Sequence, residues 1–271
     1  MNVIDTCRAD SHLKLADHDP RETFGWDKEV AKAQFVDEHA AVAELHKKLM
    51  AEEQRSLLIA LQAMDAGGKG GIVRSVMTGL NPAGVKVQGF GVPTDQELAH
   101  DFLWRIHAAT PAKGQIGVFD RSHYEDVLVV RVKNIVPEAI WRPRYAHIRN
   151  FESLLHDSGT QVVKIFVNIS SEEQRERFQD RIDDPDERWK FRLGDLDDRA
   201  RWDDYQDAFQ EAIRETSTKH APWYVVPGDR KWVRNLVVAK ILRHHLEDID
   251  PRYPDADEDI DGLVIESLDE L

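Results

Sequence analysis

Hydrophobic residues follow two patterns along this chain. Five short runs are continuously apolar, as in strands that are buried on both faces of a parallel sheet. These runs span 56–61, 85–90, 116–119, 162–167 and 223–226. Longer segments between them have helical character, and this alternation predicts βαβ crossovers. We therefore expect an α/β protein whose ligand binds at the carboxyl ends of the strands.

The helical segments show capping motifs at their N-termini or an apolar face. Two of them begin with a capping-box pair, Thr94 with Glu97 and Ser170 with Glu173. The stretch 196–216 is long enough for one helix. The segment 28–53 repeats apolar residues at helical spacing, namely Ala31, Phe35, Val42, Leu45 and Leu49.

Length and charge define the domain organisation. The 271 residues, 41% of them hydrophobic, suit one large domain, which we place at 1–249. The net charge is −14, but the segment 247–271 holds eleven acidic residues against Arg252, which leaves only −4 for the rest. We interpret 250–271 as an acidic, flexible tail that improves solubility. The alternative is a tail that occludes or regulates a basic groove.

Several classes of protein are disfavoured by composition. Residues 1–10 lack the basic start and apolar stretch of a secretion signal, and no apolar run has the length of a membrane helix. The single cysteine, Cys7, cannot form an internal disulfide, and no Cys or His pairs have zinc spacing. We expect a cytoplasmic protein with neither a membrane nor a nucleic acid as partner.

A glycine-rich loop follows the first predicted strand at 62–71 and leads into a helical segment. Such a loop can direct backbone N–H groups at a phosphate, and Lys69 adds a full positive charge. Ala63 and Gly70 depart from the usual pattern, and Gly70 stands where a hydroxyl would hold magnesium. Asp65 is the nearest candidate to hold that metal or to accept a proton. The predicted phosphate- or nucleotide-binding residues of the loop are Ala66, Gly67, Gly68 and Gly70. The simpler alternative is a flexible turn with a solvated lysine.

A second acid lies at the end of the third predicted strand. Asp120 has the position at which P-loop enzymes bind magnesium, and Arg121 could hold phosphate oxygens. An Asp at this position could instead start a turn or cap a helix. His123 alone is weak evidence for catalysis.

A basic segment at about 175–201 predicts a helical lid. It reads as helix, break, helix, with the break at 183–186. A mobile helical hairpin of this kind can close over phosphates and deliver an arginine to the transferring group. The alternative is an exposed, salt-bridged helix, because acids are interspersed throughout. The basic residues are Arg175, Arg177, Arg181, Arg188, Lys190, Arg192, Arg199 and Arg201.

These residues resemble the polyphosphate kinase 2 family over about 24–246. The order of the motifs makes the resemblance specific, because a P-loop alone would indicate only a nucleotide enzyme. The motifs are L-Q-A-M-D-A-G-G-K (61–69), G-L-N-P (79–82), H-D-F-L-W-R (100–105), D-R-S-H-Y-E-D-V-L (120–128), W-K-F (189–191), W-D-D-Y (202–205) and H-A-P-W-Y-V-V-P (220–227).

The resemblance implies a thymidylate-kinase-like three-layer α/β/α fold with a parallel sheet and a helical lid. It implies a Mg²⁺-dependent transfer, with Mn²⁺ as an alternative ion, between inorganic polyphosphate and AMP, ADP or ATP, in a homodimer or homotetramer. By position, Asp65 and Asp120 match the family's two acids, which we expect to hold the metal. Lys69 and Arg121 match its loop lysine and phosphate-binding arginine.

The resemblance also bears on the lid and the acceptor. By position, Arg181 and Lys190 fall in the lid. His123 and Glu125 are similar to those of members that accept both AMP and ADP, whereas other groups more often have Trp and Asn. Glu125 could instead only favour the first turn of a helix. Many such members have a lysine near Gly91, so one phosphate contact could be missing here.

The sequence therefore predicts a polyphosphate kinase that converts AMP to ADP, ADP to ATP, or both. Asp65, Lys69, Asp120, Arg121 and Glu125 are the predicted catalytic residues. An ATP-dependent nucleoside monophosphate kinase shares the fold and the loop and is the alternative. A nucleotide sensor without catalysis is a third hypothesis, but two acids and a lid exceed what sensing requires.

Overall fold

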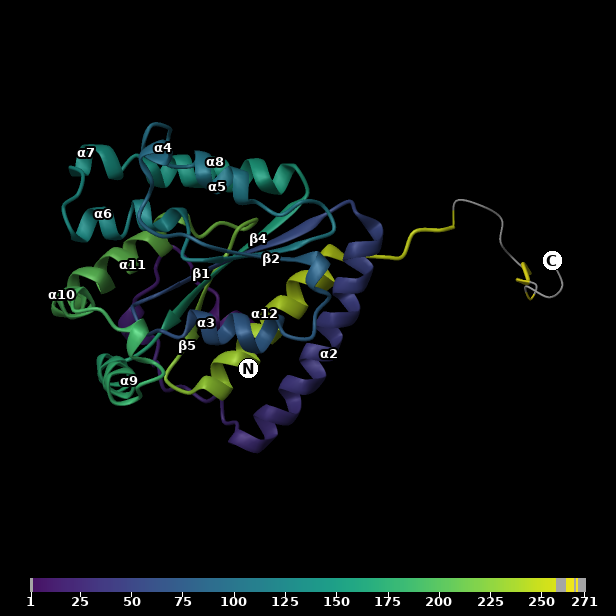
Figure 1. Cartoon of the computed structure of the whole chain (residues 1–271), viewed down its shortest axis with the longest axis horizontal. Helices are drawn as coiled ribbons and strands as arrows, with labels where there is room; N and C mark the ends of the chain where they lie inside the picture. Colours follow the sequence, from purple (N-terminus) through teal and green to yellow (C-terminus); the bar gives the residue numbers. More distant parts are fainter. Residues whose placement is uncertain (1, 257–261, 266, 268–271) are drawn as a thin grey trace.

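The computed structural model describes residues 2–256, 262–265 and 267, and this part of the chain contains one five-stranded parallel sheet (Figure 1). The strand order is β2-β3-β1-β4-β5, so β1 lies at the centre. All five predicted strands are confirmed. Their bounds are β1 (Ser56–Ala63), β2 (Val85–Gly89), β3 (Ile116–Asp120), β4 (Thr160–Asn168) and β5 (Trp223–Pro227).

Helices cover both faces of the sheet, which confirms the three-layer α/β/α architecture (Figure 1). One layer contains α1 (Val3–Cys7), α2 (Lys28–Glu52), α3 (Lys69–Ile72), the π-helical turn η2 (Val73–Met77) and α12 (Lys231–Ile249). The other contains α4 (Asp95–Leu98), α5 (Trp104–Ala109), α6 (Val129–Val132), α7 (Glu138–Trp141), α8 (Arg144–Asp157) and α11 (Trp202–Thr216).

The remaining helices are short or lie beyond the strand ends. The segment predicted as a lid forms α9 (Ser171–Asp183), η5 (Arg188–Lys190) and α10 (Gly194–Ala200), which has the predicted helix, break, helix order. Three further 3₁₀ turns are η1 (Leu15–Asp17), η3 (Pro82–Gly84) and η4 (His123–Asp126).

The central strand explains why the strand runs are continuously apolar. Leu57, Ile59 and Leu61 of β1 belong to the core cluster under α2 and α12. Leu58 belongs to the cluster on the opposite face, with residues of α5 and α8. All four side chains are almost completely buried. Both faces of the strand therefore require apolar residues.

The predicted helix features are mostly confirmed. The helix predicted at 28–53 is α2, and its Val42 and Leu49 are fully buried. The capping box of Thr94 and Glu97 is present in both directions, although α4 has only one turn. The second capping box is only half correct. Ser170 Oγ accepts from the Glu173 amide, but the Ser170 amide donates to Asp229.

The single helix predicted at 196–216 was wrong. The chain breaks between α10 and α11 at Arg201, where φ is −104° and ψ is 29°. The Arg201 guanidinium donates a 2.6 Å hydrogen bond to the Val132 carbonyl at the end of α6. This tertiary contact anchors the break, and local helical periodicity cannot reveal it.

The last helix ends where the acidic tail was predicted to begin. Ile249 closes α12, and Asp250 adopts the left-handed conformation with φ 50°. Positions 257–261, 266 and 268–271 of the predicted tail lie outside the described residues, so its role stays a prediction. Among the helices that are described, none combines the length and the apolar character needed to cross a membrane.

Candidate active site

The glycine-rich loop after β1 has a strained backbone that only small residues allow. Ala66 and Gly68 adopt positive φ angles of 59° and 93°. A Cβ atom at Gly67 would lie 2.4 Å from the Cβ of Ala63, so no larger residue fits there. Gly70 has open space around it and is not required by packing. Strain of this kind is typically concentrated at functional sites.

The loop presents unused hydrogen-bond donors. Within the described chain, the backbone N–H groups of Gly68, Lys69 and Gly70 donate to no acceptor. These groups lie at the first turn of α3, where the backbone favours an anion. The loop geometry therefore fits phosphate, as the sequence predicted.

Two residues of α9 are hydrogen-bonded to carbonyl groups of the loop. The sequence did not indicate this role. Gln174 donates to the Asp65 carbonyl at 2.9 Å, and Arg177 donates to the Ala66 carbonyl at 3.0 Å. These two hydrogen bonds fix the orientation of the Asp65 and Ala66 carbonyl groups. Arg177 belongs to the predicted lid segment, but it is buried and supports the loop.

Lys69 is more buried than expected of a ligand-facing lysine. The residue is 9% exposed, and Nζ lies 3.3 Å from the Ala63 carbonyl oxygen. Burial and the nearby Arg121 lower the pKa of Lys69, while Asp65 and other carboxylates oppose this effect. Among the described residues, no carboxylate lies within 4.0 Å of the Lys69 amino group, so this group can interact with an added anion.

The end of β3 brings the second predicted pair beside the loop. Asp120 lies in register with Leu61 of β1, so both strands end at the same edge of the sheet. Arg121 adopts φ 64° and donates from Nη2 to Asp65 Oδ1 at 2.8 Å. The side-chain cap of η4 is Ser122, so the capping alternative does not apply to Asp120.

Glu125 extends this cluster from η4. Burial raises the pKa of Glu125, although Arg121 and Lys69 partly oppose the shift. The Gln62 amide is oriented so that its oxygen accepts from Ser122 and its nitrogen donates to Glu125 Oε1 at 3.0 Å. Gln62, which the sequence did not identify as a site residue, thus fixes Glu125 from the central strand. Glu125 does lie in the first turn of η4, but its contacts are with the site.

The charges of the cluster act on one another. Burial alone would lower the pKa of Arg121, but the carboxylates of Glu125, Asp65 and Asp120 outweigh burial and raise it. The five predicted catalytic residues therefore form one electrostatic unit around the loop.

A fully buried polar network supports the chain after Arg121. His123 Nε2 and the Tyr124 hydroxyl contact Glu152 Oε1 at 3.2 and 2.8 Å. Glu152 Oε2 accepts from Lys164 Nζ at 2.5 Å. The network joins η4 to α8 and β4. His123 therefore stabilises the fold through Glu152.

A cavity of about 430 Å³ opens beside the cluster and is of suitable size for a small ligand. Asp65, Arg121 and Glu125 line it, as does Gly91, whose carbonyl accepts from Arg105 at 3.0 Å. Further lining groups come from separate elements, and the sequence indicated no site role for them, although Arg105, Asp126 and Tyr205 lie within the motifs of the family resemblance. They include Arg105, Asp126, Arg144, Tyr205 and Phe209.

The two predicted lid residues lie apart from these contacts. Lys190 is paired with Glu187 in its own segment. Arg181 lies over the Phe178 ring, with 5.8 Å between its guanidinium carbon and the ring centroid. Their part in the site stays a prediction that depends on closure of the segment.

Asp65 and Asp120 are the two carboxylates that could form a magnesium site. In the part of the chain that is described, no group of three or more His, Cys, Asp or Glu residues is arranged to hold a metal. Asp65 and Asp120 offer hard oxygen donors beside a phosphate-type loop. Magnesium is often held by one or two carboxylates together with substrate phosphates, so this donor set fits the ion.

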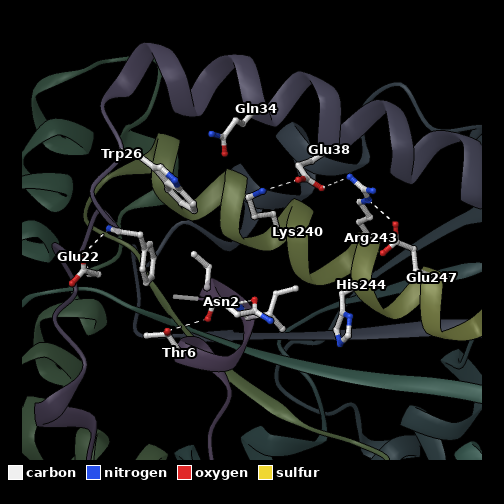
Figure 2. Close-up of a pocket in the computed structure, with 13 residues that line it drawn as sticks. Asn2, Thr6, Glu22, Trp26, Gln34, Glu38, Lys240, Arg243, His244 and Glu247 are labelled. Atoms are coloured by element: carbon white, nitrogen blue, oxygen red, sulfur yellow. Dashed lines mark hydrogen bonds and ion pairs between the residues drawn. The ribbon is translucent and has the colours of Figure 1, made fainter.

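A second hollow, of about 600 Å³, lies between the amino-terminal segment, α2 and α12 (Figure 2). Its cations are paired. Lys240 contacts Glu38 at 2.7 Å, and Arg243 contacts Glu38 at 3.3 Å and Glu247 at 2.7 Å (Figure 2). These charges satisfy one another and offer little to an added anion.

Comparison with known proteins gives a consistent result. The family model described as "Polyphosphate kinase 2" matches residues 25–254. An AMP/ADP-polyphosphate phosphotransferase from Meiothermus ruber is 51% identical over 254 residues, which cover 94% of this chain and 95% of that protein. An ADP-polyphosphate phosphotransferase from Rhodopseudomonas palustris is 43% identical and covers 79% of this chain and 78% of its own length.

Solved structures agree. The crystal structure of polyphosphate kinase 2 from Arthrobacter aurescens TC1 superposes with a TM-score of 0.93 and 44% identity. The match covers 97% of this chain and 95% of that one. The similarity therefore extends over both the sheet and the segments that form the site.

Proposed function

This chain belongs to the polyphosphate kinase 2 family, and on that premise we propose that it transfers phosphate between inorganic polyphosphate and adenine nucleotides. We propose that both AMP and ADP serve as acceptors, giving ADP and ATP. The observation that carries this proposal is the convergence of Asp65, Lys69, Asp120, Arg121 and Glu125 at the phosphate-type loop. The likeness to a relative named for both acceptors supports it.

The chemistry proceeds by in-line attack of a terminal nucleotide phosphate oxygen on the end phosphate of the polyphosphate chain. The new P–O bond forms as the bond to the next phosphate of the chain breaks. Lys69, Arg121 and the loop N–H groups stabilise the charge on the transferring group. Because phosphoanhydrides are made and broken together, the reaction can run in both directions.

Asp65 and Asp120 would hold Mg²⁺, or Mn²⁺ in its place, and the bound ion would neutralise phosphate charge. Arg121 donates to Asp65 and thereby orients that carboxylate toward the loop. Gln174 fixes the Asp65 backbone on the other side. The loop acid is thus positioned from two directions before any ligand binds.

The cavity beside the cluster is the proposed nucleotide site. Its wall combines apolar side chains, including Phe90, with the guanidinium of Arg105, which lies 5.5 Å from the Phe90 ring centroid. An apolar wall with a few polar groups suits a nucleoside, and the adjoining cations suit its phosphates. Glu125 also lines this cavity, and we propose that it compensates for the phosphate that AMP lacks.

We further propose that 175–201 closes as a lid and brings Arg181 and Lys190 to the phosphates. Helix α9, which includes the amino-terminal part of this segment, already contacts the loop through Gln174 and Arg177. Closure would exclude water and suppress hydrolysis. Following the family resemblance, we propose a cytoplasmic homodimer or homotetramer.

The decisive experiment supplies purified protein with polyphosphate, magnesium and either AMP, ADP or GDP, without ATP. Products are followed one by one by chromatography. We expect ADP and then ATP from AMP, and ATP from ADP. Turnover with ATP as the only phosphate donor and none with polyphosphate would instead support an ordinary nucleoside monophosphate kinase.

A further inference from the structure

Arg234 is a buried arginine on the face of α12 that packs against the phosphate loop. Only 2% of this residue is exposed. Nε and Nη2 donate to Asn235 Oδ1 at 3.1 and 2.8 Å. The guanidinium is thus hydrogen-bonded to a neutral amide on its own helix.

The other side of this guanidinium lies directly against the loop backbone. A Cβ atom at Gly68 would lie 2.2 Å from Nη1 of Arg234, and one at Gly71 would lie 3.0 Å from Nη2. Any side chain at Gly68 would therefore collide with Arg234. The two glycines allow the loop to approach a buried positive charge closely.

Within the part of the chain that is described, no carboxylate pairs with the Arg234 guanidinium. Among the described residues, the charged side chain that perturbs Arg234 is another cation, Arg177. Burial and Arg177 together lower the pKa of Arg234 to about 10, which still leaves it charged at neutral pH. Arg177 itself pairs with Glu173 at 2.7 Å, so Arg234 is the uncompensated member.

A buried cation without a partner normally destabilises a fold, because desolvation is not offset by an ion pair. Stability therefore does not account for an arginine at this position. An anion at the adjacent loop would provide the missing compensation, and Coulomb interactions are strong where water is excluded.

We propose that Arg234 is a positioning residue of the phosphate site, which acts through the backbone of Gly68 and Gly71 to favour a bound polyanion at the loop. This inference rests on the proposed function only in that the loop binds phosphate. Arg234 is not assigned to contact the reacting atoms. Its positive charge makes the loop more attractive to phosphate before and during transfer.

The test compares Arg234→Met, which retains much of the volume without the charge, with Arg234→Lys, which retains the charge. Calorimetry measures binding of ADP and of tripolyphosphate, and thermal denaturation measures the stability of the ligand-free protein. We expect Arg234→Met to bind both ligands on the order of tenfold more weakly. Its ligand-free melting temperature should be unchanged or higher. Arg234→Lys should bind within about threefold of the parent.

Arg243→Met is the matched control, because it removes the same group from the same helix where carboxylates compensate it. It should lower the melting temperature and leave binding unchanged. A loss of stability in Arg234→Met with unchanged binding would overturn the proposal, as would a variant that cannot fold. Binding is measured without turnover, so a parent enzyme that binds both ligands but transfers no phosphate would contradict only the proposed function.

Discussion

Arg234 and Arg243 lie on the same helix, α12, but their guanidinium groups have opposite environments. Arg243 lies in the hollow of Figure 2, where Glu38 and Glu247 accept from it and Glu38 also holds Lys240. Arg234 lies behind the phosphate loop, and the charged side chain acting on it within the described chain is Arg177. One end of the helix contains a closed set of ion pairs, and the other contains uncompensated positive charge.

The difference shows how the same residue types can serve stability or binding. A cation that already has a carboxylate partner gains little from an added phosphate. Lys69 is an intermediate case, because it is buried and bonded to the Ala63 carbonyl, while Asp65, Asp120 and Glu125 act on it from a distance. Where charge is left uncompensated by the protein, a polyanionic ligand can compensate it.

The largest expected effect separates two lysines with opposite environments. Lys69→Ala should lower turnover on the order of a thousandfold, because it removes a preorganised charge from the transferring group. Lys240→Ala, which removes a paired cation, should retain turnover within about twofold. Steady-state assays with polyphosphate and ADP, together with circular dichroism, test both variants. Similar losses in the two would contradict the comparison.

The next effect concerns the metal. Asp120→Asn should lower turnover on the order of a hundredfold and shift the magnesium titration to higher concentrations, because an amide cannot supply the charge that a hard cation prefers. Glu247→Gln is the control from the paired region. If Asp120→Asn retains the parent's titration curve, another group holds the metal.

A smaller, selective effect is expected at Glu125. Glu125→Asn should lower turnover with AMP about tenfold more than turnover with ADP, since the carboxylate could replace interactions of the missing phosphate. Each acceptor is assayed separately with polyphosphate and without ATP. Equal losses on both acceptors would indicate that Glu125 only supports the turn η4.

The raised pKa of Glu125 also predicts a pH-dependent stability effect for a second variant, Glu125→Gln. Burial favours the protonated form in the folded state, so its stabilising contribution is present at low pH and is lost as the pH rises through the folded pKa. Glu125→Gln should therefore raise the melting temperature more at pH 8 than at pH 5. A constant difference across this range would argue that the carboxylate is not desolvated.

In the paired region, loss of the shared acid should affect stability alone. Glu38→Gln leaves Lys240 and Arg243 without their common partner, and the Glu38 side chain is only 13% exposed. We expect a loss of about 1 kcal/mol in the free energy of unfolding and an unchanged turnover. Denaturant titration measures the first quantity. A clear loss of activity would show that this region communicates with the site.

The smallest predicted effect comes from adding a cation to the site. Gly91 lines the cavity, and a Cβ atom there would meet nothing within 4 Å. Gly91→Lys should lower the KM for the nucleotide about twofold to threefold, because an exposed charge is partly screened. The gain should disappear at high salt. An unchanged KM at low salt would place Gly91 away from the nucleotide phosphates.

The sequence alone predicted the parts of this protein that depend on local pattern. The five strands, helix α2 and the phosphate loop each have a signal within a short stretch of residues. Their order along the chain was enough to predict the layers of the fold. The motifs 61–69 and 120–128 indicated the family, which the comparisons confirmed. The individual roles of the site residues stay predictions.

Tertiary structure determined which charges are compensated. Arg177 reads in sequence as one of several lid arginines, yet it is buried against the loop, and Arg234 follows the last strand without any motif. Gln62 meets Glu125, and Arg201 meets Val132, only because distant elements pack together. Free energies of charged groups depend on burial and on partners from other elements. Periodicity and spacing along a chain contain no record of those neighbours.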